Sequence, residues 1–406
     1  MVGAQDHAAA PPLTAFRPPP KPVLDPNPQW AESAAKKVPM MTRFLLILTL
    51  LIACTPRGVV TLDPQAARVG QVEKVFIATT RKQEQDGSFG SERSERVNFA
   101  RYDVSVPPNR TLGEINWPPR HGRADPRKHF LTTDEIVYQA GAPFQADLRA
   151  QLAAKGGEAV IFIHGYNNNF AEGVYRVAQF AHDLQLPGAV VHYAWPSAAQ
   201  PLGYVYDRDS ALFARDGLEA LINEVAEAGA TRILVVAHSM GASLTMESLR
   251  QMAIRGDQRA LDRLSGVILI SPDIDVDVFR ATAHAMGELP QPFVIFGSDR
   301  DKFLRISAGL TGQAERLGSL SDVSKVADLN VTFLDVSNFA EGAGHFTMGD
   351  SPALLLLLSR LGEVEGAFER DRVSRVGLVS GVVLTVQNAT QIVLSPVAGV
   401  ASELTK

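Results

Sequence analysis

The sequence contains a single cysteine, Cys54, and it lacks an excess of positive charge. One cysteine cannot close a disulfide within the chain, and it cannot build a cysteine-based zinc or iron–sulfur site. The 39 Lys and Arg residues are outnumbered by 44 Asp and Glu, so the net charge is -5. Because nucleic-acid binding neutralises phosphates with basic side chains, this balance disfavours a nucleic-acid partner.

Further absences argue against a metal site, a dinucleotide site and a membrane-spanning helix. The sequence has no H-E-x-x-H metal spacing and no glycine-rich dinucleotide loop after its first strand, so we expect neither a metal ion nor a cofactor. Its apolar run at residues 44–53 is ten residues long, whereas a membrane-spanning helix needs about 20. The composition of the whole chain, 46% hydrophobic and 20% charged, is typical of a globular protein.

The short apolar run belongs to a secretion pattern. Arg43 precedes the run and the small residue Ala53 ends it, as in a signal peptide. The last residues, Leu51-Ile52-Ala53-Cys54, resemble the lipobox of bacterial lipoproteins. That resemblance implies that Cys54 is lipidated, that residues 1–53 are removed, and that up to three acyl chains anchor the protein in a membrane.

The residues on either side of this signal bear on where translation starts and on which membrane holds the protein. Residues 1–39 are rich in proline, which predicts a disordered extension, and we expect translation to start at Met40 or Met41. Thr55, rather than an aspartate, follows the cysteine. By resemblance to lipoprotein sorting, we expect a lipid-anchored protein at the periplasmic face of the cell envelope, in the outer rather than the inner membrane.

Beyond the signal, we expect a linker at residues 54–72, one domain at 73–362 and a tail at 363–406 whose pattern fits either helix or strand. From residue 158, short continuous apolar runs such as Val160–Ile163 alternate with helical patterns. Runs of this kind are typical of strands buried on both faces. The alternation predicts an α/β fold, with a mostly parallel twisted sheet, helices on both faces and reactive groups at the carboxyl ends of the strands.

A nucleophile elbow follows one of these strands. The segment Ala237-His238-Ser239-Met240-Gly241 fits the G-x-S-x-G pattern with alanine in the first position. The pattern requires small residues because the serine lies on a strained turn between a strand and a helix. A β-branched run precedes the segment and a helix-forming run follows it, so we predict Ser239 as the nucleophile. The alternative is a buried serine at the start of a helix.

The loop His164–Asn169 follows the first strand of the alternating run. In serine hydrolases this loop supplies one backbone N–H to the oxyanion, and the residue after the nucleophile supplies the other. We assign these two donors to Tyr166 and Met240. The asparagines of the loop also suit a cap on the following helix, and both interpretations are compatible.

The general base is found by elimination. In proteins with a nucleophile elbow, the catalytic residues follow one another along the chain in the order serine, acid, histidine. Two histidines follow Ser239, and His284 falls before the penultimate strand, which is too early in this order. His345 lies in a glycine-flanked loop after the last strand, so we predict that it is the base.

The acid is expected after the strand at 293–296, where Asp299 and Asp301 both qualify. Asp301 directly precedes a helix-forming run, whose backbone amides could hold its carboxylate. Asp273 and Asp275 follow the preceding strand and are further alternatives.

Trp195 and Tyr204 are candidates for lining a substrate pocket. Both are aromatic residues near strand ends. Side chains of this kind pack in the core equally often.

These motifs, in this order, resemble the α/β-hydrolase superfamily over roughly residues 73–360, and more narrowly a bacterial family described only as esterase/lipase-like. The resemblance favours Asp301 over Asp299. It implies a serine hydrolase that uses Ser239, His345 and Asp301 to cleave a small-molecule or lipid ester, with thioesters and amides left open. The alternative is a non-catalytic lipoprotein that uses a hydrolase scaffold as a binding module in the envelope.

Overall fold

The computed structural model describes residues 57–312, 315–339, 345, 351–352, 355 and 383–394. The predicted signal segment 1–53, the lipidation residue Cys54 and most of the predicted tail lie outside these residues. Within the described residues, no helix has the length and apolarity that crossing a membrane requires.

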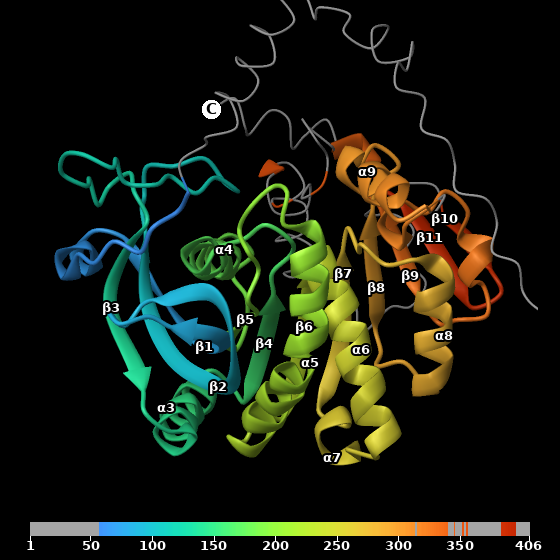
Figure 1. The fold of residues 1–406 in the computed structure, drawn as a ribbon, viewed down its shortest axis with the longest axis horizontal. Coiled ribbons are helices and arrows are strands. Elements are labelled where there is room, and N and C mark those ends of the chain that lie inside the picture. The colour runs from blue at the N-terminus through green and yellow to red at the C-terminus, as the bar shows by residue number, and fades with distance from the viewer. Residues whose placement is uncertain are drawn as a thin grey trace, which may run out of the picture. The chain divides into compact units, whose positions relative to one another are not determined.

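An eleven-stranded sheet forms the centre of the fold, in the order β10-β11-β9-β8-β7-β6-β4-β5-β1-β2-β3 (Figure 1). Neighbouring strands from β11 through to β1 run parallel, and the pairs β10–β11, β1–β2 and β2–β3 are antiparallel. The predicted fold class is therefore confirmed. The strands are β1 (Gln71–Gln83), β2 (Phe89–Val106), β3 (Leu131–Tyr138), β4 (Glu158–Ile163), β5 (Ala189–Ala194), β6 (Arg232–His238), β7 (Leu264–Ile270), β8 (Phe293–Gly297), β9 (Thr332–Asp335), β10 (Val383–Val386) and β11 (Ala389–Val393).

Helices cover both faces of the sheet because its central strands are apolar on both sides. Along β4, Ile161 and Ile163 enter the core on the face of α3, α5, α6 and α8, whereas Val160 and Phe162 enter the core on the face of α4. The helices are α3 (Gly141–Ala154), α4 (Phe170–Asp183), α5 (Tyr204–Glu227), α6 (Met240–Arg255), α7 (Gln258–Leu261), α8 (Val276–Met286) and α9 (Lys302–Leu310), with short 3₁₀ turns η1 (Pro64–Arg68), η2 (Leu317–Ser319), η3 (Val323–Val326) and η4 (Ser337–Phe339).

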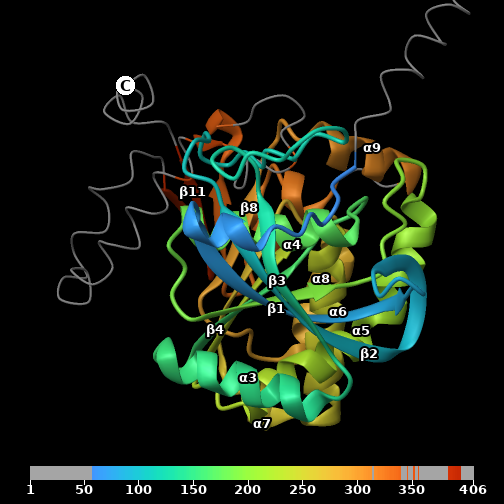
Figure 2. The same cartoon turned by 90° about the vertical axis from the view of Figure 1, so that its left-hand side faces the viewer.

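The parallel strands all end at one edge of the sheet, where the loops after β4, β6, β8 and β9 meet. Helix α9 lies at this end of the fold, and α3 and α7 lie at the opposite end in both views (Figures 1 and 2). Every residue proposed from the sequence to carry chemistry, within the described part, follows one of these strands.

Two segments outside the predicted alternation also join the fold. The part of the predicted linker that is described contains η1, whose Ala66 is buried, and Asp63 donates its backbone N–H to the carbonyl of Thr132 at 2.8 Å. Part of the tail forms β10 and β11, and β11 extends the sheet by pairing with β9. The described ends of the domain therefore contribute to its packing.

Candidate active site

Ser239 lies on the turn between β6 and α6, with φ of 53° and ψ of -121°. Residues other than glycine rarely adopt backbone dihedral angles in this region, so the turn is strained. Two backbone hydrogen bonds join it to β7 and the loop that follows: the Ser239 N–H donates to the carbonyl of Ile270 at 2.9 Å, and its carbonyl accepts from the N–H of Asp273 at 3.2 Å. A strained strand-to-helix turn is the geometry that a nucleophile elbow requires.

Two glycines allow the neighbouring loops to approach the elbow. A Cβ atom on Gly241 would lie 2.3 Å from the carbonyl oxygen of His164. A Cβ atom on Gly165 would lie 2.6 Å from Nδ1 of His238 and 2.9 Å from Cβ of Ser239. Larger residues at either position would push apart the loop after β4 and the start of α6, which carry the two predicted oxyanion donors.

Ser239, His345 and Asp301 form one chain of hydrogen bonds. Oγ of Ser239 is 2.9 Å from Nε2 of His345, and Nδ1 of His345 is 2.8 Å from Oδ2 of Asp301. A neutral imidazole that donates from Nδ1 to a carboxylate leaves Nε2 free to accept the serine proton. This arrangement can deprotonate the hydroxyl as it attacks an electrophilic carbon.

Asp301 is the N-cap of α9, and the helix fixes its carboxylate. Its Oδ1 accepts the backbone N–H of Leu304 at 3.0 Å, while Oδ2 faces the imidazole. The side chain is fully buried, which favours the pairing because a buried carboxylate without partners would be costly.

The other three acids have different surroundings. Asp299 is exposed, and its backbone N–H donates to Ser337. Asp275 caps α8 by accepting the backbone N–H groups of Asp277 and Val278. Asp273 forms an ion pair with Arg316 at 3.1 Å. Of the four acids considered from the sequence, the structure brings Asp301 to His345.

The loop after β4 is fastened on one side by a buried carboxylate. Asp207 of α5 is fully buried and accepts the backbone N–H of Asn167 at 3.0 Å, the N–H of Ala198 at 2.6 Å and the hydroxyl of Ser197 at 2.6 Å. Asn167 has φ of 58°, so this turn is also strained. Three donors on one carboxylate compensate both its burial and this strain.

A buried arginine fastens the same loop on another side. Arg81, at the end of β1, donates to the carbonyl oxygens of Asn168 at 2.8 Å, Ser197 at 3.2 Å and Gly90 at 2.9 Å. Burial lowers the pKa of Arg81 to about 10, and neighbouring Asp207 counteracts the shift. At neutral pH the guanidinium therefore keeps its charge. Neither Arg81 nor Asp207 was predicted from the sequence to support this loop.

These contacts leave the two predicted oxyanion donors available. Asn167 and Asn168 both donate their backbone N–H groups to side chains, Asp207 and Ser197 respectively. Among the described residues, no acceptor binds the backbone N–H of Tyr166 or of Met240. Tyr166 lies on the loop after β4 and Met240 begins α6, and these two segments pack together at Gly165 and Gly241.

A cavity of about 380 Å³ lies beside Met240, between α5, α6, α8 and α9. Tyr204 lines this cavity and donates its hydroxyl to Asp273 at 2.8 Å. Burial raises the pKa of Tyr204 to about 12, so the phenol stays neutral. Arg316 also lines the cavity, so part of its wall is polar.

Trp195 does not lie in this cavity. Its side chain is fully buried, its ring stacks on His164 at 4.8 Å between centroids, and its Nε1 donates to the carbonyl of His164 at 2.7 Å. Burial also holds the pKa of His164 well below its ordinary value, so this imidazole stays neutral. The structure therefore places Trp195 in the support of the loop, not at a wall open to substrate.

No group of three or more His, Cys, Asp or Glu side chains in the described part of the chain is arranged to hold a metal ion. The residues gathered here are instead a hydroxyl, an imidazole, a carboxylate and two backbone amides. That set is suited to acyl transfer.

Residues 140–360 match the sequence profile of a family described as alpha/beta hydrolase of unknown function (DUF900). No curated protein matches the chain. Among solved structures, it is similar to Aspergillus fumigatus lipase B, with 15% identity, a TM-score of 0.35 and coverage of 55% of this chain and 57% of that one. It is also similar to a Pyrococcus furiosus esterase, with 14% identity, a TM-score of 0.34 and coverage of 77% and 96%.

Proposed function

The chain belongs to the DUF900 family of α/β-hydrolases, and we propose that it is a serine hydrolase that cleaves a carboxylic ester through an acyl-enzyme. The observation that carries this proposal is the chain of hydrogen bonds from Ser239 through His345 to Asp301, with distances of 2.9 Å and 2.8 Å. These distances support the proposal because they put a hydrogen-bonded base beside the hydroxyl and a carboxylate acceptor beside that base.

In the first half of the reaction, Oγ of Ser239 attacks the ester carbonyl and His345 takes the hydroxyl proton on Nε2. Asp301 accepts from Nδ1, so it holds the productive tautomer and stabilises the imidazolium that forms. The negative oxygen of the tetrahedral intermediate is bound by the backbone N–H groups of Tyr166 and Met240. His345 then protonates the departing alkoxide, which leaves as the alcohol.

In the second half, water replaces the alcohol. His345 removes a proton from water as it attacks the acyl-enzyme, and the same two N–H groups stabilise the second intermediate. Collapse of that intermediate returns the proton to Oγ of Ser239 and releases the carboxylic acid. We call the loop after β4, residues His164–Asn169, the oxyanion loop. Its backbone does not need to reorganise during these steps, because Asp207 and Arg81 already fix it.

A series of p-nitrophenyl esters of increasing acyl length tests this function and its substrate range. We expect turnover of at least the short esters, since the cavity beside Met240 is open to solvent and partly apolar. Thioesters and amides are tested in parallel because the same groups can act on each. Folded protein that hydrolyses none of them would instead support a non-catalytic binding role.

The proposed enzyme is held at a membrane by lipid on Cys54. Replacing Cys54 by serine is expected to block lipid attachment and to leave the segment 1–53 uncleaved, because the thiol is the acylated group. Radiolabelled palmitate incorporation and the mass of the protein measure both effects. Incorporation equal to that of the wild type would contradict the anchor.

A further inference from the structure

Exposed apolar side chains gather around the active-site end of the fold. Among the described residues, eight of the twelve large hydrophobic side chains that are exposed belong to α5, α8, α9 or the loop before α5. Four of them form what we call the rim, and their exposed fractions are 99%, 72%, 61% and 69%. The rim consists of Leu202, Val205, Ile306 and Leu310.

Contacts within the structure show that the two halves of the rim are neighbours. The hydroxyl of Tyr204, next to Val205, lies 2.8 Å from Oγ of Ser307, next to Ile306. The ring of Phe303 on α9 stacks on Tyr166 of the oxyanion loop at 5.2 Å. The two halves of the rim therefore lie close together, on elements that contact the loop carrying Tyr166, and the rim is not a scatter of single exposed residues.

Helix α9 has the character of a helix that rests on a lipid surface. Its exposed side includes Lys302 and Arg305 together with Ile306 and Leu310, and the helix contains no acidic residue. Ile306 and Leu310 are four positions apart, so they lie on the same side of the helix. Cations beside exposed apolar residues are typical of helices that bind anionic lipid headgroups and bury their apolar side chains among them.

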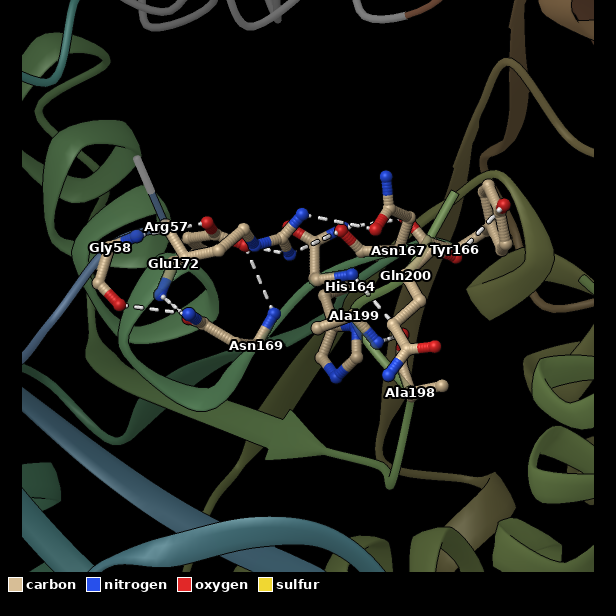
Figure 3. Close-up of polar contacts among 12 residues, drawn as sticks. Arg57, Gly58, His164, Tyr166, Asn167, Asn169, Glu172, Ala198, Ala199 and Gln200 are labelled. Atoms are coloured by element: carbon tan, nitrogen blue, oxygen red, sulfur yellow. Dashed lines mark hydrogen bonds and ion pairs between the residues drawn. The ribbon is translucent and has the colours of Figure 1, made fainter. Parts of the chain in front are cut away.

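The N-terminal end of the described chain is fixed to the same region. Arg57 donates to Oδ1 of Asn167 at 3.0 Å and to the carbonyl of Asn167 at 2.8 Å, and it pairs with Glu172 (Figure 3). Gly58 adds two bonds, donating its N–H to Glu172 at 3.0 Å and accepting from Asn169 at 2.8 Å. The chain thus enters the domain at the oxyanion loop.

This entry point sets how far the proposed anchor can be from the active site. Only Thr55 and Pro56 separate Cys54 from Arg57. Three residues of fully extended chain reach at most about 11 Å. A lipid on Cys54 would therefore keep the oxyanion loop close to the bilayer surface.

We propose that the rim docks on an anionic lipid surface and that the enzyme takes its ester substrate from that surface. This inference rests on the proposed hydrolase function, and it adds the partner and the place where the substrate is met. Docking by the rim alone is weak, because one shallow apolar contact gives only reversible binding. Combined with the proposed lipid on Cys54, it orients Ser239 toward esters whose carbonyl lies at the membrane interface.

The test compares hydrolysis of two esters by the protein as cells process it, with its lipid on Cys54. One substrate is p-nitrophenyl acetate in solution, and the other is a fluorogenic long-chain ester in vesicles of phosphatidylglycerol and phosphatidylethanolamine. The triple variant Leu202→Ser, Val205→Ser and Ile306→Ser avoids the residues that line the cavity. We expect it to hydrolyse the vesicle ester at least tenfold more slowly, with turnover of the soluble ester within twofold of the wild type.

Ile254→Ser is the matched control. Ile254 is 61% exposed, as Ile306 is, but it lies near the end of α6, close in sequence to α7 at the opposite end of the fold (Figure 1). This variant should hydrolyse both esters at the wild-type rate. A loss equal to that of the triple variant would overturn the inference.

Other outcomes separate this inference from the proposed function. Wild-type protein that hydrolyses the soluble ester, with vesicle hydrolysis unchanged in the triple variant, would overturn the lipid surface and leave the hydrolase standing. The same result with a dimer that becomes a monomer in sedimentation would assign the rim to a second copy of the chain. Wild-type protein inactive on both esters would overturn the function and the inference together.

Discussion

Replacing Ser239 by alanine is expected to lower kcat for ester hydrolysis by on the order of 10⁶-fold, to the level of the uncatalysed reaction plus binding effects. The substitution removes the only atom that can form the acyl-enzyme in the proposed mechanism. Stability should change little, since within the described part of the chain the hydroxyl bonds only to His345, and the turn is held by backbone bonds to Ile270 and Asp273. Steady-state kinetics and thermal unfolding measure the two effects.

Ser248→Ala provides a control on the same helix. Ser248 is a buried residue of α6 whose hydroxyl donates to backbone carbonyls, including that of Leu244 at 2.9 Å, away from the proposed site. Its loss should reduce stability modestly, by about 1 kcal/mol, while kcat stays close to the wild-type value. Hydrolysis by the Ser239→Ala protein at the wild-type rate would show that the nucleophile is a different group.

Replacing Asp301 by asparagine is expected to lower kcat by about 10⁴-fold, because an amide favours the wrong tautomer of the imidazole. The amide nitrogen would donate to Nδ1 of His345, so Nε2 would carry the proton and could not accept one from Ser239. Asparagine caps helices about as well as aspartate, so α9 should keep its bond to the N–H of Leu304. The variant thus isolates the chemical role from the structural one.

Asp299→Asn is the matched control, because it makes the same chemical change two residues earlier. Asp299 is exposed, and its carboxylate has no bond to His345. We expect turnover within a fewfold of the wild type for this variant. A large loss in Asp299→Asn together with an active Asp301→Asn would move the acid to Asp299, and two active variants would direct attention to Asp273.

The sequence predicted the central sheet well because strands buried on both faces leave an unambiguous pattern. The strand expected at Val160–Ile163 lies within β4, and the strand expected at 293–296 lies within β8. Strand β3 and helix α3 were not predicted. The buried apolar residues of α3 recur at every fourth position, at Phe144, Leu148 and Leu152. The rest of the helix mixes alanines with polar residues, and no side chain caps its first turn.

Residue type and chain order were enough to select Ser239 and His345 as candidates, and the structure brings these two side chains within hydrogen-bonding distance. The choice between Asp299 and Asp301 depended on which carboxylate a helix start would hold, and the structure places Asp301 in that position. The support of the oxyanion loop was not predictable. Arg81 is separated from Asn168 by 87 positions, and no local pattern indicates a contact over such a separation.

Labelling with a fluorophosphonate probe, followed by mapping of the modified peptide by mass spectrometry, tests the central claim most directly. The probe forms a covalent bond only with a serine that its neighbours activate. Our account predicts one modified residue, Ser239, in the folded wild-type protein, and no labelling of the Ser239→Ala variant. Folded wild-type protein that stays unlabelled, or that is modified at another serine, would contradict the account.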